Sequence, residues 1–90
     1  MKMTYKNVTE QAKKEAKEFG DVVIEAFDFM IDGRVVETVS IRKVRRMFQG
    51  LKATVYEVWS TTKGLIYSGL NPKKAKREMM KRLRWRKRRG

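Results

Sequence analysis

The 90-residue chain contains no cysteine and no histidine. These absences exclude disulfides, thiol chemistry, zinc sites built from Cys and His, and the commonest general base. No apolar run approaches the roughly 20 residues that a membrane-spanning helix needs. The N-terminal stretch MKMTYKNVTE also lacks the apolar core of a signal peptide. We therefore expect a cytoplasmic protein, located in the host cytoplasm if the chain is viral.

Acidic residues are scarce, and the charge is unevenly distributed. The chain has 23 Lys and Arg against 10 Asp and Glu, a net charge of +13. Residues 72–90 hold eleven basic residues and one acidic residue, so the segment before them carries only +3. The composition is 41% hydrophobic, which is enough for one packed domain. Such charge asymmetry indicates a polyanionic partner.

The first third of the sequence predicts a helix and then a hairpin. Residues 7–20 have Asn7 as a helix cap, Glu10 three positions later, and an apolar stripe that includes Ala12, Ala16 and Phe19. Segments 22–31 and 34–39 are rich in β-branched and aromatic residues. They flank Asp32-Gly33, a dipeptide typical of a tight hairpin turn.

The segment SIRKVRRMFQG is ambiguous between helix and strand. At helical spacing its apolar residues share one side and its basic residues the other, whereas a strand would mix both kinds on each face. We therefore predict a helix over 41–49, with Ser40 as cap and Gly50 as stop. The alternative that the preceding strand continues through Ile41 stays open.

The remaining segments predict a second hairpin and a final helix. The turn TTKG lies between KATVYEVWS and LIYSG, and Asn71-Pro72 begins a helix whose apolar stripe is Ala75, Met79, Met80 and Leu83. SIRKVRR and NPKKAKR are similar at an offset of 31 residues. We predict an α+β domain over 1–83, an N-terminal helix followed by two ββα units (αββαββα), with α-β-β-β-α as the alternative. Residues 84–90 would be a basic tail that extends the last helix.

Catalytic chemistry has little support in the sequence. Asp28, Glu37 and Glu57 are the strand-borne acids that could hold a metal in a nuclease, but nothing groups them as a pair. The six glycines are dispersed, so no glycine-rich loop can cradle a phosphate. We predict a protein that is not an enzyme and uses no metal or cofactor.

The final helix carries the more specific signal. At 100° per residue its basic side lies opposite the apolar stripe, which is too narrow for a membrane-surface helix. Trp85 lies on this basic side. Its expected role is either a stacking platform for a base or an anchor for a protein partner, and the alternative is that it folds back onto the domain. Nucleic acid of undetermined type is the predicted partner. The predicted contacts are Arg42, Lys43, Arg45, Arg46, Lys73, Lys74, Arg77, Lys81, Arg84, Trp85, Arg86, Lys87, Arg88 and Arg89.

The chain resembles the double-stranded RNA-binding domain in its order of a helix followed by strands and in the segment SGLNPKKAKREMMKRL. The last helix of that family begins with a KKxAK-type lysine cluster. The resemblance implies that Lys73, Lys74 and Lys76 contact phosphates. The family's histidine-bearing loop has no counterpart in this chain. The choice between RNA and DNA stays open.

A protein partner is the alternative to nucleic acid. The basic helix would then dock on an acidic patch of a host enzyme that handles nucleic acid, with Trp85 as the anchor. Small basic chains without His or Cys suit an accessory protein of a phage or mobile element, and we interpret this sequence in that way. The oligomeric state is not predicted.

Overall fold

The structure is a computed structural model that describes residues 1–18, 20 and 22–89, with only the backbone described for Phe48 and Arg89. It is an α+β fold, as predicted, but its order is βαββββα rather than αββαββα. The elements are β1 (Met3–Asn7), α1 (Thr9–Glu18), β2 (Val22–Ile31), β3 (Arg34–Phe48), β4 (Leu51–Ser60), β5 (Gly64–Gly69) and α2 (Pro72–Arg89).

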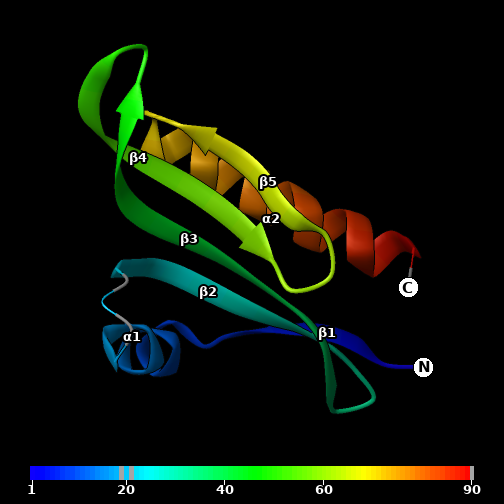
Figure 1. Cartoon of the computed structure of the whole chain (residues 1–90). Helices are drawn as coiled ribbons and strands as arrows, with labels where there is room; N and C mark the ends of the chain where they lie inside the picture. The colour runs from blue at the N-terminus through cyan, green and yellow to red at the C-terminus, as the bar shows by residue number, and fades with distance from the viewer. Residues whose placement is uncertain (19, 21, 90) are drawn as a thin grey trace.

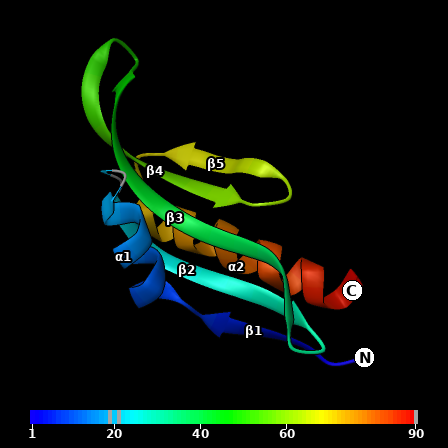
Figure 2. The same cartoon turned by 60° about the horizontal axis from the view of Figure 1, so that its bottom comes forward.

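The five strands form one antiparallel sheet in the order β1-β2-β3-β4-β5, so each strand pairs with its neighbours in sequence (Figure 1). Helix α2 crosses one face of the sheet, and α1 lies beside the first half of β2 (Figures 1 and 2). The main core lies between α2 and the sheet, around Phe29, Ile41 and Val58. A smaller cluster of Ala16, Val23 and Ala26 holds α1.

The predicted hairpin turns are present. Asp32 and Gly33 both have positive φ, 50° and 80°, which matches the twist of the flanking strands. The second predicted hairpin joins β4 and β5 through residues 61–63. An additional tight turn that was not predicted joins β3 to β4 at Gln49 and Gly50, with φ of 53° and 82°.

The predicted helix over 41–49 is wrong, and with it the two ββα units. Residues 41–48 continue β3, which pairs with β4 over ten consecutive positions from Val39 to Phe48. Ser40 and Gly50 are therefore a strand residue and a turn residue. Among the described residues, the pairing of β3 with β2 ends at Lys43. Both faces of this outer part of β3 are largely uncovered. Burial therefore does not require apolar and polar residues to alternate there, and the sequence shows no alternation.

The N-terminal strand was also missed. Met3 and Tyr5 alternate with polar residues and pack against the main core, but the stretch has only five residues. The helix begins at Thr9, and the Asn7 Oδ1 atom accepts hydrogen bonds from the Thr9 amide at 2.9 Å and the Thr9 hydroxyl at 2.6 Å. Phe19, which the sequence placed in the helix stripe, lies outside the described residues.

Helix α2 matches its prediction closely. Of its predicted apolar stripe, Ala75, Met79 and Leu83 are fully buried, and Met80 is half-buried against the main core. The Asn71 Oδ1 atom accepts hydrogen bonds from the backbone amides of Lys73 at 2.9 Å and Lys74 at 3.3 Å, which caps the helix. The helix continues unbroken to Arg89, so the predicted tail is part of it. Neither α2 nor α1, the two described helices, is both long and apolar enough to cross a bilayer.

Candidate nucleic-acid interface

The basic side chains of α2 divide into an inner and an outer set. The inner set faces the sheet and meets acidic residues there. Lys76 pairs with Glu25 and lies over the ring of Phe27, with Nζ 5.5 Å from the ring centroid. Arg82 forms two hydrogen bonds to Glu37, from Nε at 2.9 Å and from Nη2 at 3.0 Å. These cations hold the helix on the sheet.

Glu37 is the centre of this inner set, and only 1% of it is exposed. Its Oε2 atom also accepts a hydrogen bond from the Ser60 hydroxyl at 2.6 Å. Burial alone would raise the pKa of this carboxyl. The hydrogen bonds from Arg82, Ser60 and Thr62, with the charge of Arg82, outweigh burial and hold the pKa below its ordinary value. Glu37 is therefore a charged anchor for α2.

The outer basic face of α2 points away from the sheet, except that Lys74 in its first turn lies over the ring of Tyr67 in β5, with Nζ 5.9 Å from the ring centroid. All its side chains are exposed, and within the described part of the chain none has an acidic group within 4.0 Å. Over residues 73–88 the face is about 22 Å long at 1.5 Å per residue. We define this outer basic face as Lys73, Lys74, Arg77, Lys81, Arg84 and Arg88.

The start of this face is unfavourable for the helix itself. The first turn of α2 contains no acidic residue and two lysines, Lys73 and Lys74. Cations at a helix N-terminus oppose the helix dipole and cost up to about 1 kcal/mol each. The protein therefore places charge there against its own stability, which is expected for contacts with an anionic ligand.

The last two turns of α2 do not form a free tail. Arg86 turns inward, with its Nε 3.4 Å from Glu37 Oε1 and its guanidinium 5.7 Å from the centroid of the Phe29 ring. Lys87 lies over Tyr5, 5.7 Å from the ring centroid. The prediction that Arg86 contacts nucleic acid is therefore not supported by its position. The side chain of Arg89 lies outside the described residues.

Trp85 is neither free nor buried. It is 38% exposed, and the Arg82 guanidinium stacks on its ring 4.5 Å from the centroid. The ring borders a hollow of about 360 Å³ with Lys63, Ile66 and Glu78. One role of Trp85 is thus structural, because it holds Arg82 in position to bond Glu37.

The predicted basic cluster on β3 is split between the two faces of the sheet. Alternation places Lys43 and Arg45 on the α2 side with Ile41, and Arg42 and Arg46 on the opposite side. The predicted helix over 41–49 would have placed all four basic residues on one side. The strand instead places two of them on each face of the sheet.

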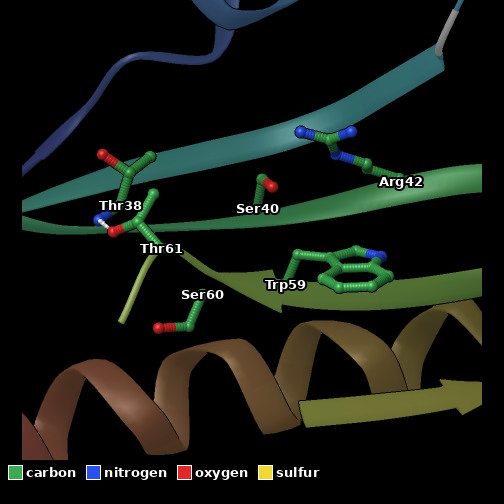
Figure 3. A pocket seen from close by; sticks show the side chains of 6 residues that line it. All are labelled: Thr38, Ser40, Arg42, Trp59, Ser60 and Thr61. Carbon is green, nitrogen blue, oxygen red and sulfur yellow. Dashed lines mark hydrogen bonds between the residues drawn. The ribbon is translucent and has the colours of Figure 1, made fainter. Parts of the chain in front are cut away.

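The side opposite α2 carries its own charged pair. The Arg46 Nε atom donates to Glu57 at 2.7 Å, and the Trp59 indole N–H donates to the same carboxylate at 3.0 Å. The hydrogen bond from Arg46 is the main reason that the pKa of Glu57 lies below its ordinary value. Figure 3 shows Arg42 and Trp59 on neighbouring strands of a shallow hollow of about 310 Å³, while Ser60 points toward α2.

The acids considered for a metal site have other partners. Glu37 binds Arg82, Glu57 binds Arg46 on the opposite face of the sheet, and Asp28 accepts a hydrogen bond from the Thr38 hydroxyl at 2.6 Å. Across residues 1–18, 20 and 22–89, no three side chains of His, Cys, Asp or Glu are grouped so as to hold a metal ion.

No protein-family model, curated protein or solved structure matches the chain. Of the lysines that the double-stranded RNA-binding domain resemblance implies, Lys73 and Lys74 lie on the outer basic face, and Lys76 is paired with Glu25. Sequence reasoning missed Lys52, which lies opposite Met47 in the β3–β4 hairpin. The Gln-Gly turn between two strand-like runs was the signal that would have identified it.

Proposed function

We propose that this chain is a small, non-enzymatic nucleic-acid-binding protein that contacts the phosphate backbone through the outer basic face of α2. The observation that carries the proposal is the division of charge along one helix. The inner cations are matched by Glu25 and Glu37, while the six outer cations have no matching acids among the described residues. Clustered exposed Lys and Arg gain free energy on a polyanion by releasing its counterions.

A protein-binding adaptor is the second candidate. It is favoured by the exposed edge of Trp85 beside its hollow, because a partly exposed Trp among apolar and charged neighbours is a frequent interface anchor. Nucleic acid is the better match, since the outer basic face extends over the whole helix and Trp85 occupies only one edge of it.

The test is a salt titration of binding to a duplex and to a single strand. A triple variant, Arg77→Gln with Lys81→Gln and Arg84→Gln, removes the centre of the outer basic face. Each lost duplex phosphate contact lowers the slope of log K against log salt by about 0.9, so the triple variant should lose about 2.7. The variant should remain folded, because exposed side chains without partners contribute little stability.

The matched control is Lys6→Gln with Lys14→Gln and Lys17→Gln, which removes the same charge from exposed positions on β1 and α1. We expect its slope to stay close to that of the wild type. Equal losses in both triple variants would show a response to net charge alone and would contradict the proposed interface. A wild-type chain that binds no nucleic acid even at low salt would favour the adaptor.

A further inference from the structure

The hairpin between β3 and β4 projects beyond the rest of the sheet. The last residue of β3 that pairs with β2 is Lys43, and the last residue of β4 that pairs with β5 is Tyr56. Within the described part of the chain, residues 44–55, here named the β3–β4 arm, therefore pair only with each other. Figures 1 and 2 show this arm extending from one end of the molecule, which measures 47 × 27 × 19 Å. Apart from Val55, which is buried at its base, the described side chains of this ribbon are exposed or half-buried, so it gains little from burial, which indicates a role outside folding.

The arm is basic and ends in apolar residues. It contains Arg45, Arg46 and Lys52 and no acidic residue. Met47 is 65% exposed and Leu51 is 73% exposed, next to the Gln49-Gly50 turn. Charged sides with an apolar end fit a ligand that presents phosphates at its rim and apolar thymine methyl groups among the base edges within.

One side of the arm continues the surface formed by α2. Arg45 lies opposite Thr54 and donates to its hydroxyl at 3.1 Å, and Lys52 lies opposite Met47 on the same side. Strand alternation places this side with Ile41, which packs against α2. Gly69 pairs with Tyr56 at the base of the arm, and α2 begins three residues later. Figure 1 shows the arm and the beginning of α2 at the same end of the sheet.

We infer that the β3–β4 arm enters the major groove of duplex DNA while the outer basic face of α2 contacts the flanking phosphates. The inference rests on the proposed function and names its ligand. Paired strands lie about 4.8 Å apart, and six residues of strand reach about 20 Å, so the ribbon fits a groove about 12 Å wide and 8.5 Å deep. The major groove of an RNA duplex is deep and narrow, and it excludes such a ribbon.

A second copy of the chain is a poorer occupant for the arm. Among its described side chains, the large apolar ones that are exposed are Met47 and Leu51, at the end of the ribbon. A stable protein–protein interface buries at least about 1,200 Å² in total, more than the end of one narrow ribbon supplies. In a symmetric dimer the positive charges of the two arms would also repel each other.

The experiment compares binding of the full chain to a DNA duplex and to an RNA duplex of the same sequence. The arm variant is Arg45→Gln with Lys52→Gln, and its control, Lys6→Gln with Lys14→Gln, also lowers the net charge from +13 to +11. The wild type should bind DNA at least about tenfold more tightly than RNA, and the arm variant should lose about tenfold on DNA. The control should lose less than about threefold.

Guanine N7 faces the major groove, so methylation by dimethyl sulfate reports on occupancy there. Wild-type protein should protect guanines, and the arm variant, bound at low salt, should leave them exposed. Equal affinity for both duplexes, unprotected guanines, or an arm variant that matches its control would overturn the inference. So would a dimer that Met47→Ser with Leu51→Ser converts to monomer.

Failure of the arm can be separated from failure of the proposed function. If the α2 triple variant loses DNA binding while the arm variant matches its control, only the inference about the arm falls. If the wild type binds neither duplex, the proposed function falls with it.

Discussion

The two sides of α2 use the same residue types for opposite purposes. On the inner side, Arg82 and Arg86 surround Glu37, a carboxylate with only 1% of its surface exposed. On the outer side, cations such as Arg77 and Arg84 are exposed and have no acid within 4.0 Å among the described residues. The difference teaches that a run of Lys and Arg is not one functional unit. Removing an inner cation should cost stability, and removing an outer cation should cost binding.

The largest expected effect is on the inner side. Arg82→Met keeps an unbranched apolar stem but removes the guanidinium and with it both hydrogen bonds to Glu37. Removing one side of this buried ion pair should cost about 3 kcal/mol of unfolding free energy, because Glu37 loses both hydrogen bonds from Arg82 and keeps Arg86, 3.4 Å away, as its charged neighbour. Urea unfolding measures this loss, and nucleic-acid binding by the folded fraction should be unchanged.

Arg84→Met is the matched control on the outer side. Its side chain is exposed, so the free energy of unfolding should change by less than about 0.5 kcal/mol. If Arg82→Met and Arg84→Met proved equally stable, the structural role of the inner cations would be refuted.

A smaller effect is expected in acid. Burial raises the pKa of Glu37, but its hydrogen bonds and the charge of Arg82 hold this pKa below its ordinary value. The hydrogen bond from Arg46 likewise lowers the pKa of Glu57. A depressed folded-state pKa adds stability that is present above the unfolded pKa of about 4.3 and lost as the pH falls through the folded value. The free energy of unfolding should be nearly constant from pH 8 to 5 and should decrease below about pH 4.

Urea unfolding at several pH values measures this dependence. Glu37→Gln removes one of the two groups, so its stability should decrease less steeply in acid than that of the wild type. A variant curve parallel to the wild-type curve below about pH 4 would show that Glu37 does not contribute to the acid dependence.

The sequence predicts α2 well because three local signals agree there. Asn71 caps the helix, Pro72 suits its first position, and the stripe that contains Met79 faces a covering sheet. The Asp32-Gly33 hairpin was predictable for a similar reason, since its turn chemistry is contained in two residues.

The β3 segment was not predictable from periodicity. The side chains of residues 44–47 in its outer half are exposed or half-buried, so burial imposed no period of two, and the helical spacing of Ile41, Val44 and Met47 was accidental. Tertiary pairing decided the outcome. The Gln49-Gly50 turn was the available clue, but Gln is an uncommon residue at positive φ.

The basic character of the candidate interface was predictable from the sequence, but the residues that form it were predictable only in part. No local pattern announces that Glu37 will meet Arg82, 45 residues away in sequence. Arg86 was assigned to a tail, although it follows Leu83 by three residues and Met79 by seven, which is inner-side spacing. Helical periodicity, continued beyond Leu83, would have placed it correctly.

The most direct measurement compares Arg86→Gln with Arg88→Gln, two positions on one helix that lose the same charge. We expect that Arg88→Gln lowers the salt slope of DNA binding by about 0.9 and leaves unfolding by urea unchanged. Arg86→Gln should keep the wild-type slope and lose about 1 kcal/mol of stability, because its partner is the buried Glu37. Equal slopes for the two variants, or a stability loss in Arg88→Gln alone, would contradict the division of α2 into a structural and a binding side.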